Sequence, residues 1–363
     1  MFVKATKGVK TMKLDTILKN IEPLRSEVYD KVQKRLDNLT KPIGSLGRLE
    51  ELVIQLAGIS GDVFPKVDKK CVIIMCADNG VVEEGVSSCP KSVTAEVTRN
   101  FIRGITGVNV LARHAGSEIA VVDIGVDADI QNEGILSRKV RWGTDNIVKG
   151  PAMSREEAGK AIEIGIEMVG ELKSKGYNLL GTGEMGIGNT TTSSAIIAAY
   201  ADCPIEILVG KGAGLTAEAY RKKIYVVEKA LEVNNPDIND PLDVLAKVGG
   251  LDIAGLVGCF IGAAYYRVPI LIDGFISGAA ALLAGKMHPC VKDYIIPSHC
   301  SAEPGTITIF KLLSMEPMLN LGMRLGEGTG AALAFHIVDA AVKTYTQMGT
   351  FDDANIEQYV PLD

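Results

Sequence analysis

Apolar runs that suit buried strands alternate along this chain with stretches of helical spacing. The first run, residues 71–77, is uninterrupted and rich in Val and Ile, which is typical of a strand buried on both faces of a parallel sheet. Later runs of the same character, separated by helical patterns, lie at residues 119–123, 178–180, 268–272 and 294–296. The alternation predicts an α/β fold, in which a Rossmann-like parallel sheet is flanked by helices.

The helical stretches carry recognisable end signals. Pro90 opens a predicted helix that continues to about His114. Ser154 and Glu157 match a capping box, so another helix is expected from there to about Lys175. Spacing alone predicts helices at residues 49–59, 190–201, 216–233, 275–287 and 331–341, and two short amphipathic helices within 14–39.

The helices at the two ends of the chain do not fit the alternation of strands and helices. With 363 residues, the chain is long enough for one large or two modest domains. We predict a large Rossmann-like domain over residues 25–310 that carries the active site. A second small helical domain is predicted from both chain ends, residues 1–24 and 311–363, closing over the edge of the sheet.

Composition and charge exclude several classes of protein. The chain is 47% hydrophobic and 23% charged, which supports a large core, and its net charge of -6 offers no basic face for nucleic acid. Seven cysteines without a CxxC pair and four scattered histidines favour buried thiols over disulfides or a metal site. The most apolar stretch, 251–266, contains glycines and an Asp and falls short of a membrane span.

The start of the chain lacks a targeting signal. Residues 1–13 are rich in Lys but have no continuous apolar core, so they do not match a signal peptide. Met12 is an alternative start of the protein. We therefore expect a cytoplasmic protein that binds neither membranes nor nucleic acid.

Two glycine-rich segments each place one glutamate ahead of a predicted helix. Residues 321–331 (LGMRLGEGTGA) hold Glu327 among glycines, and residues 181–191 (GTGEMGIGNTT) hold Glu184 in a similar arrangement. Glycine lets the backbone approach a ligand closely and adopt dihedral angles that other residues avoid. Each glutamate is therefore a candidate catalytic group, although a solvated acidic turn before a core helix gives the same pattern.

The segment around Glu184 also offers a phosphate site. Asn189, Thr190 and Thr191 stand at the predicted start of a helix, where free backbone N–H groups and the helix dipole hold anions. An ordinary N-cap explains the same residues equally well. Residues 210–214 (GKGAG) form a further glycine loop.

The same segment leaves other functions open. Residues 181–186 match G-x-G-x-x-G after a predicted strand, so an NAD-type dinucleotide-dependent dehydrogenase is one alternative. A non-catalytic nucleotide-binding subunit is another. Residues 297–304 mix Ser, His and Glu, but the chain has no G-x-S-x-G elbow, which argues against a serine hydrolase.

Acidic residues end several of the predicted strands, namely Asp78, Asp123 and Asp273. In open α/β sheets, ligands bind at the carboxyl ends of the strands, so each acid is placed to bind sugar hydroxyls. Holding a loop through hydrogen bonds from backbone N–H groups is the commoner use of Asp in a turn. Both interpretations remain open from the sequence.

Taken together, the chain resembles the nicotinate-nucleotide–dimethylbenzimidazole phosphoribosyltransferase family from about residue 14 onward. The matching segments are 39–50 (LTKPIGSLGRLE), 76–86 (CADNGVVEEGV), 183–191 (GEMGIGNTT), 248–253 (VGGLDI), 271–275 (LIDGF), 297–303 (PSHCSAE) and 324–331 (RLGEGTGA). The resemblance implies transfer of phosphoribose from nicotinate mononucleotide to dimethylbenzimidazole or a related base, with inversion at the anomeric carbon. The product, α-ribazole 5′-phosphate, serves the lower nucleotide loop of cobalamin. A homodimer without metal or other cofactor is also implied.

The resemblance further implies roles for individual residues. Glu327 corresponds to the family's general base and Glu184 to an acid beside the reacting groups, while Lys223 and the glycine loops hold the phosphate. The residues expected to bind the substrates are Asp78, Cys89, Lys91, Met185, Gly186, Gly188, Asn189, Thr190, Thr191, Gly210, Gly212, Gly214, Lys223, Asp273, Ser301 and Leu325. Some positions depart from the family pattern: Asn79 stands where His is common, and Cys89 and Val97 stand where a relative has polar residues near the base. These departures predict a less polar pocket that accepts several bases.

The implied reaction agrees with the chemistry of the candidate residues. Nicotinate leaves from a cationic pyridinium nitrogen, so its departure needs little help from an acid. The incoming imidazole must lose its N–H proton as its other nitrogen attacks, and a carboxylate beside an apolar pocket can accept that proton. Burial raises the pKa of such a carboxylate toward neutrality. We therefore expect Glu327 to take the azole proton and Glu184 to support positive charge on the ribosyl centre.

Overall fold

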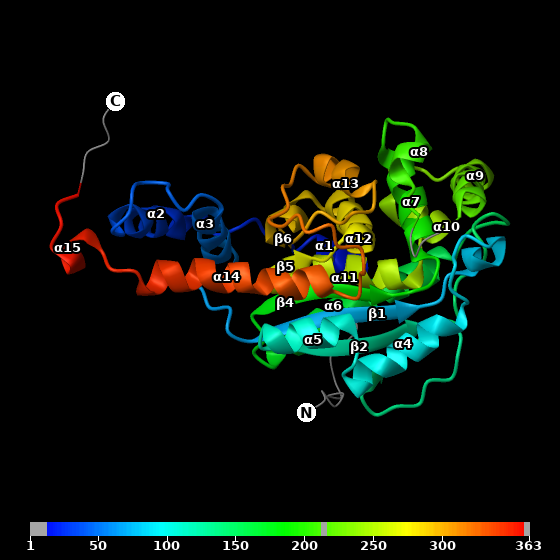
Figure 1. The fold of residues 1–363 in the computed structure, drawn as a ribbon, viewed down its shortest axis with the longest axis horizontal. Helices are drawn as coiled ribbons and strands as arrows, with labels where there is room; N and C mark the ends of the chain where they lie inside the picture. Colours follow the sequence, from blue (N-terminus) through cyan, green and yellow to red (C-terminus); the bar gives the residue numbers. More distant parts are fainter. Residues whose placement is uncertain (1–12, 212–215, 359–363) are drawn as a thin grey trace.

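The computed structural model of this protein describes residues 13–211 and 216–358 (Figure 1). Within these residues a six-stranded sheet has the order β3-β2-β1-β4-β5-β6, and every pair of neighbouring strands is parallel. This is a doubly wound α/β arrangement. The strands are β1 (Lys70–Ala77), β2 (Ser117–Gly125), β3 (Ile135–Ser137), β4 (Leu179–Met185), β5 (Ile270–Ile272) and β6 (Ile295–Pro297).

Helices cover the sheet on both faces (Figure 1). The α-helices are α1 (Leu14–Leu18), α2 (Tyr29–Asn38), α3 (Arg48–Ser60), α4 (Ser92–Arg103), α5 (Gly107–His114), α6 (Arg155–Ser174), α7 (Asn189–Tyr200), α8 (Ile205–Leu208), α9 (Ala217–Asn234), α10 (Pro241–Val248), α11 (Leu251–Tyr266), α12 (Phe275–Met287), α13 (Thr306–Leu313), α14 (Thr329–Gln347) and α15 (Phe351–Ala354). Short 3-10 helices are η1 (Ser26–Val28), η2 (Gly80–Glu84) and η3 (Pro289–Tyr294).

Strand β1 lies in the middle of the sheet and is buried along its whole length. Cys71, Ile73 and Met75 belong to the core on the side of α11, whereas Val72 and Ile74 belong to the core on the side of α3 and α14. Because both faces of this strand are covered, its sequence is apolar at nearly every position instead of alternating. The core therefore has two halves, one on each side of the sheet.

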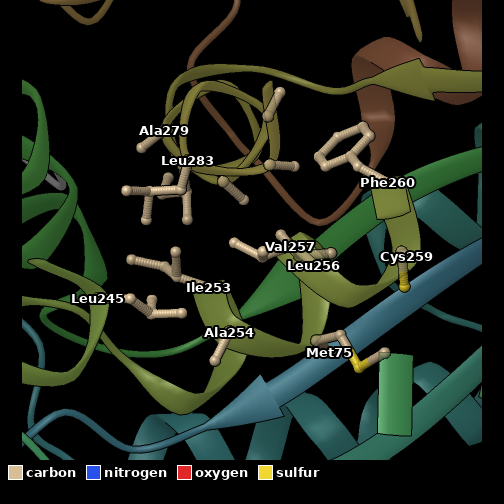
Figure 2. Close-up of a cluster of buried hydrophobic side chains, with 14 of the residues drawn as sticks. Met75, Leu245, Ile253, Ala254, Leu256, Val257, Cys259, Phe260, Ala279 and Leu283 are labelled. Atoms are coloured by element: carbon tan, nitrogen blue, oxygen red, sulfur yellow. The ribbon is translucent and has the colours of Figure 1, made fainter. Parts of the chain in front are cut away.

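Helices α6 and α11 pack with their backbones in close approach. A Cβ atom added at Gly165 of α6 would overlap the carbonyl oxygen of Gly255 in α11, so only glycine fits there. The apolar, glycine-containing stretch 251–266 is thus a buried helix of the protein core. Figure 2 shows side chains of this helix in one cluster with Met75 of β1, Leu245 of α10 and Leu283 of α12.

Helix α14 connects the sheet to the helices near the start of the chain. It contacts β4, β5 and α5 as well as α3. Arg35 of α2 donates hydrogen bonds to the carbonyl oxygens of Tyr345 and Thr346 at the end of α14. In Figure 1, α2, α15 and this end of α14 extend beyond one side of the sheet, whereas α1 contacts α6 and α11. The division into residues 25–310 and a unit of 1–24 with 311–363 stays a prediction.

Most of the predicted elements are present, and the capping box of Ser154 and Glu157 has both of its hydrogen bonds. The prediction of one helix over residues 90–114 is wrong, because Gly104 takes a left-handed conformation that ends α4 before α5 begins. The predicted strand 178–180 is too short, because β4 continues through Glu184 to Met185. Strand β3 was not predicted, and with three residues it is too short to show a pattern.

Candidate functional site

A cavity of about 340 Å³ opens where β4, β5 and β6 end at the carboxyl edge of the sheet. The first turn of α7 and the segment just before α14 complete its walls. Ligands of open α/β sheets bind at this edge. Of the residues predicted to act, the cavity wall brings together Glu184, Met185, Gly186, Gly188, Asn189, Thr190, Asp273, Ser301, Leu325 and Glu327.

Glu184 lies in the wall of the cavity near the end of β4 and is only 6% exposed. The side-chain amide of Asn189 donates a hydrogen bond to its Oε2, and the backbone N–H of Glu327 also donates to this carboxyl group. Burial, followed by the nearby carboxyl group of Asp252, raises the pKa of Glu184 to about 8. Glu184 therefore carries a proton over much of the neutral range before a ligand arrives.

Asp273 holds the turn that carries Glu327. Its Oδ1 accepts hydrogen bonds from the backbone N–H groups of Gly330 and Ala331 at 2.7 and 3.2 Å, and its Oδ2 accepts one from Gly328 at 3.1 Å. These N–H groups stand at the start of α14, where a carboxylate is stabilised by the free donors and the helix dipole. The contacts of Asp273 are thus those of a loop-holding acid, although it also lines the cavity.

The backbone at Glu327 adopts an uncommon conformation against the end of β4. Glu327 has a φ of 64°, between Gly326 at 81° and Gly328 at 102°. This left-handed region is unfavourable for residues that have a Cβ atom. A Cβ atom at Gly183 would overlap the carbonyl oxygen of Glu327, so the strand glycine makes room for the turn.

The side chain of Glu327 reaches the start of α5. Its Oε2 accepts a hydrogen bond from the backbone N–H of Val108 at 3.0 Å, and Gly107 and Thr106 also donate to this carboxyl group. Burial raises the pKa of Glu327, and these hydrogen bonds oppose that shift. Glu327 therefore faces the cavity with a carboxyl group held at a helix N-terminus.

Lys223 lies just behind the first turn of α7. Its side chain is 1% exposed, and its Nζ donates a hydrogen bond to the hydroxyl of Thr190 at 2.9 Å. Burial lowers the pKa of Lys223 to about 8, and the charge of Glu303 opposes that shift. Gly210 lies against the same glutamate, because a Cβ atom there would overlap Glu303 Oε2. Three predicted phosphate-binding residues, Lys223, Thr190 and Gly210, thus gather at one end of the cavity.

Other predicted binding residues do not line the cavity themselves, although Lys223 and Gly210 lie directly behind Thr190 and Glu303, which do. Those that do not line it are Asp78, Cys89, Lys91, Thr191, Gly210 and Lys223, while Gly212 and Gly214 fall outside the described residues. Asp78 accepts a hydrogen bond from the backbone N–H of Asp127 at 2.7 Å, and Lys91 forms an ion pair with the Asp127 side chain. Asp123 accepts one from Val126 at 2.9 Å. Asp78 and Asp123 therefore hold the loop after β2.

Several buried polar side chains of the site are missing from the sequence-based candidates, and Asp252 and His299 are two of them. Asp252 is fully buried and accepts a hydrogen bond from Asn189 Nδ2 at 2.9 Å, and burial raises the pKa of Asp252 to about 6. His299 lines the cavity next to Gly274. The paired glycines before Asp252 were the available signal, because a Cβ atom at Gly250 would be only 2.5 Å from Asp252 Oδ1.

The structure does not support the dinucleotide interpretation of residues 181–186. Gly181 and Gly183 lie inside β4, whereas a dinucleotide fingerprint needs its glycines in the turn between strand and helix. Gly181 makes room for Ala331, since a Cβ atom there would be 3.0 Å from the Ala331 side chain. The glycines of this strand thus admit the start of α14, and the alternative function they suggested is not favoured.

Two further observations concern metal ions and membranes. Among the described residues, no group of three or more His, Cys, Asp or Glu side chains is arranged to hold a metal ion. None of the helices in residues 13–211 and 216–358 combines the length and the apolar character needed to cross a membrane.

Comparisons with known proteins point to one group of enzymes. A phosphoribosyltransferase family profile matches residues 21–356. The chain is similar to the nicotinate-nucleotide–dimethylbenzimidazole phosphoribosyltransferase of Clostridium acetobutylicum, 64% identical over 351 residues that cover 97% of this chain and 100% of the relative. It is 65% identical over 344 residues to the enzyme of that name from Acetivibrio thermocellus, covering 95% and 98% of the two chains. Its fold is similar to the crystal structure of the enzyme of that name from Thermus thermophilus, with a TM-score of 0.87, 39% identity and coverage of 93% and 100%.

Proposed function

The chain belongs to the nicotinate-nucleotide–dimethylbenzimidazole phosphoribosyltransferase family, and we propose that it transfers phosphoribose from nicotinate mononucleotide to 5,6-dimethylbenzimidazole or a related base. The products are α-ribazole 5′-phosphate and nicotinate, with inversion at the anomeric carbon. One observation carries this proposal: the cavity is lined by buried Glu184, by half-buried Glu327 and by Thr190 with Lys223 behind it. The chain that forms this cavity aligns with named relatives over nearly its full length.

We assign the general base to Glu327. The reaction breaks the bond between the ribosyl carbon and the pyridinium nitrogen, forms a bond from that carbon to an azole nitrogen, and releases the proton of the other azole nitrogen. Glu327 lines the cavity, and burial raises its pKa, which makes its carboxylate a stronger proton acceptor. Leu325 and Met185 line the same cavity and give it an apolar side for a flat base.

We assign to Glu184 the stabilisation of the positive charge that develops on the ribosyl centre. Its carboxyl group is buried beside the cavity, where water screens charges poorly, so its ionised form would stabilise a developing cation strongly. Because the free protein holds Glu184 protonated over much of the neutral range, the ionised form depends on the positive charge that the substrate brings. The two glutamates thus have different tasks in one transfer step.

We place the binding site for the phosphate of the nucleotide between the first turn of α7 and Lys223. Thr190 lines the cavity in the first turn of α7, and Lys223 Nζ already contacts its hydroxyl. A helix N-terminus with free N–H donors and a lysine behind it suits a phosphate dianion. Binding of the dianion would raise the lowered pKa of Lys223, since the ammonium form would gain an anionic partner.

A direct assay tests the proposal. The purified protein is incubated with nicotinate mononucleotide and dimethylbenzimidazole, and both products are followed by chromatography. Release of nicotinate together with α-ribazole phosphate is the expected result. Tight binding of the nucleotide without product would instead support a non-catalytic nucleotide-binding subunit. Turnover of a reduced nicotinamide cofactor in a parallel assay would support the dehydrogenase.

We further propose that the protein is a cytoplasmic homodimer. Leu321 and Leu325, in the segment that leads to the cavity, are 58% and 60% exposed, and a second copy of the chain would cover such apolar side chains. The seven cysteines are free, which suits a reducing compartment. Light scattering during size-exclusion chromatography tests the dimer, and cell fractionation tests the location.

A further inference from the structure

One amide joins two buried acids behind the cavity. Asn189, the first residue of α7, has two N–H donors on its side chain. Its Nδ2 donates to Glu184 Oε2 and, at 2.9 Å, to Asp252 Oδ2. Glu184 lines the cavity, whereas Asp252 does not. Asn189 therefore links Asp252 to the acid in the cavity wall by hydrogen bonds.

The position of Asp252 is fixed tightly from several sides. A Cβ atom at Gly250 would be 2.5 Å from Asp252 Oδ1, and one at Gly186 would overlap its Oδ2. The backbone N–H of Ile253 donates to Oδ1 at 3.0 Å. Asp252 also stands in the first turn of α11, where the helix dipole favours a negative charge. The fold thus encloses one carboxyl group that does not line the cavity.

Among the residues that the structure describes, no cation is one of the groups that most affect the pKa of Glu184 or of Asp252. Besides Asp252, Glu184 faces Asp273 after β5, Asn189 of α7 and the backbone N–H of Glu327. The pKa of Asp252 is affected most by burial, which raises it, and then by hydrogen bonds from Asn189 and from the backbone N–H of Ile253, which lower it. Arg324 also lines the cavity but is an exposed residue, and His299 acts on Asp273. Two buried carboxylates joined by one amide are costly to ionise at the same time.

We propose that Asp252 is a positioning residue that acts through Asn189, so that Asp252 and Glu184 share a proton in the free enzyme and release it when the cationic pyridinium of nicotinate mononucleotide enters the cavity. No bond between heavy atoms changes in this step, and the proton passes to solvent. The inference rests on the proposed substrate. According to this inference, substrate binding ionises Glu184, the acid that stabilises the positive charge on the ribosyl centre.

The experiment counts protons directly. Nicotinate mononucleotide is titrated into the protein by calorimetry at pH 7 in two buffers that differ in ionisation enthalpy. Wild type, Asp252→Asn and Glu184→Gln are compared, with Asp243→Asn as the matched control because Asp243 is an acid in the first turn of α10. Protons exchanged by the ligand phosphate are common to all four proteins. We expect the wild type and the control to release at least twofold more protons than either of the other variants.

A second readout separates positioning from a structural role. Removing the charge of Asp252 lowers the pKa of Glu184, so the acid limb of kcat/KM for Asp252→Asn should move to lower pH. A purely structural role would lower the melting temperature and leave this limb in place. Equal proton release by wild type and folded Asp252→Asn overturns the inference. If that variant does not fold, unchanged release by Glu184→Gln overturns it. Failure of wild type to bind the nucleotide would instead reject the proposed function.

Discussion

The segments that carry the two glutamates look alike in sequence and differ sharply in structure. Each has one acid among glycines and a helix after it. Glu184 belongs to a strand, and a neighbouring acid raises its pKa further than burial alone. Glu327 belongs to a left-handed turn, and its carboxyl group rests on backbone N–H groups at the start of α5. The difference lies in which charges and dipoles the fold brings to each acid.

The contrast also shows what the glycines do. In β4, Gly181 and Gly183 make room for the start of α14 and for the Glu327 turn, so the first segment is shaped to receive the second. In the turn, Gly326 and Gly328 supply backbone conformations with positive φ. One set of glycines thus permits close packing and the other permits a sharp turn. Glu184, at the end of the strand, lies near Asp252 and Asp273, whereas Asp273 is the acid that acts on Glu327 in the turn.

Replacing Glu327 tests the contrast with the largest expected effect. Glu327→Gln keeps the shape of the side chain but cannot accept the azole proton. We expect turnover to fall by about 10²–10⁴-fold, the usual cost of losing a general base, while binding of nicotinate mononucleotide changes only a few-fold. Steady-state kinetics and a binding titration measure the two quantities. Glu171→Gln, at a buried glutamate outside the cavity, is the control. Near-full turnover of a folded Glu327→Gln protein would transfer the base role to Glu184.

Replacing Lys223 tests whether the phosphate binds on the Glu184 side of the cavity. Lys223→Ala removes a buried ammonium group beside Thr190, so we expect nucleotide binding to weaken by about 10–100-fold, as for other lost hydrogen bonds to charged groups. Binding of dimethylbenzimidazole should stay nearly unchanged. Lys222→Ala, at the exposed neighbouring residue, is the control. Equal losses for both ligands would point to a damaged fold and not to a phosphate contact.

The raised pKa of Glu184 should also make the free energy of unfolding depend on pH. The carboxyl group of Glu184 titrates near 4.5 in an unfolded chain and near 8 in the folded protein. Between these values the folded state binds more protons, so its stability falls as the pH rises. Glu184→Gln should therefore gain melting temperature relative to wild type between pH 5 and pH 8, by about 5 °C or more. Thermal melts across this range measure the difference, with exposed Glu156→Gln as the control. A difference that does not change with pH would disprove the raised pKa.

The sequence predicted the sheet well and the surroundings of the acids poorly. The first strand was recognisable because β1 is buried on both faces and therefore apolar at nearly every position. The placement of Glu184 inside β4 was missed, because glycines usually signal a turn and here they admit another segment. Asp252 was missed because its hydrogen-bond partner Asn189 is distant in sequence. Contacts between distant segments decide these environments, and local patterns do not contain them.

The part of the cavity expected to bind the azole substrate provides the last test, which has the smallest expected effect. Cys89 and Val97 both depart from the family pattern, but only Val97 lines the cavity. An apolar wall discriminates weakly between ligands, while an unmet hydrogen-bonding group discriminates strongly. We therefore expect wild type to use benzimidazole and dimethylbenzimidazole with kcat/KM values within about tenfold of each other. Val97→Gln should shift this ratio several-fold, and Cys89→Ser should leave it nearly unchanged. Competition between the two bases in one reaction gives the ratio directly. Strict selection of dimethylbenzimidazole by wild type would show that other side chains read the base.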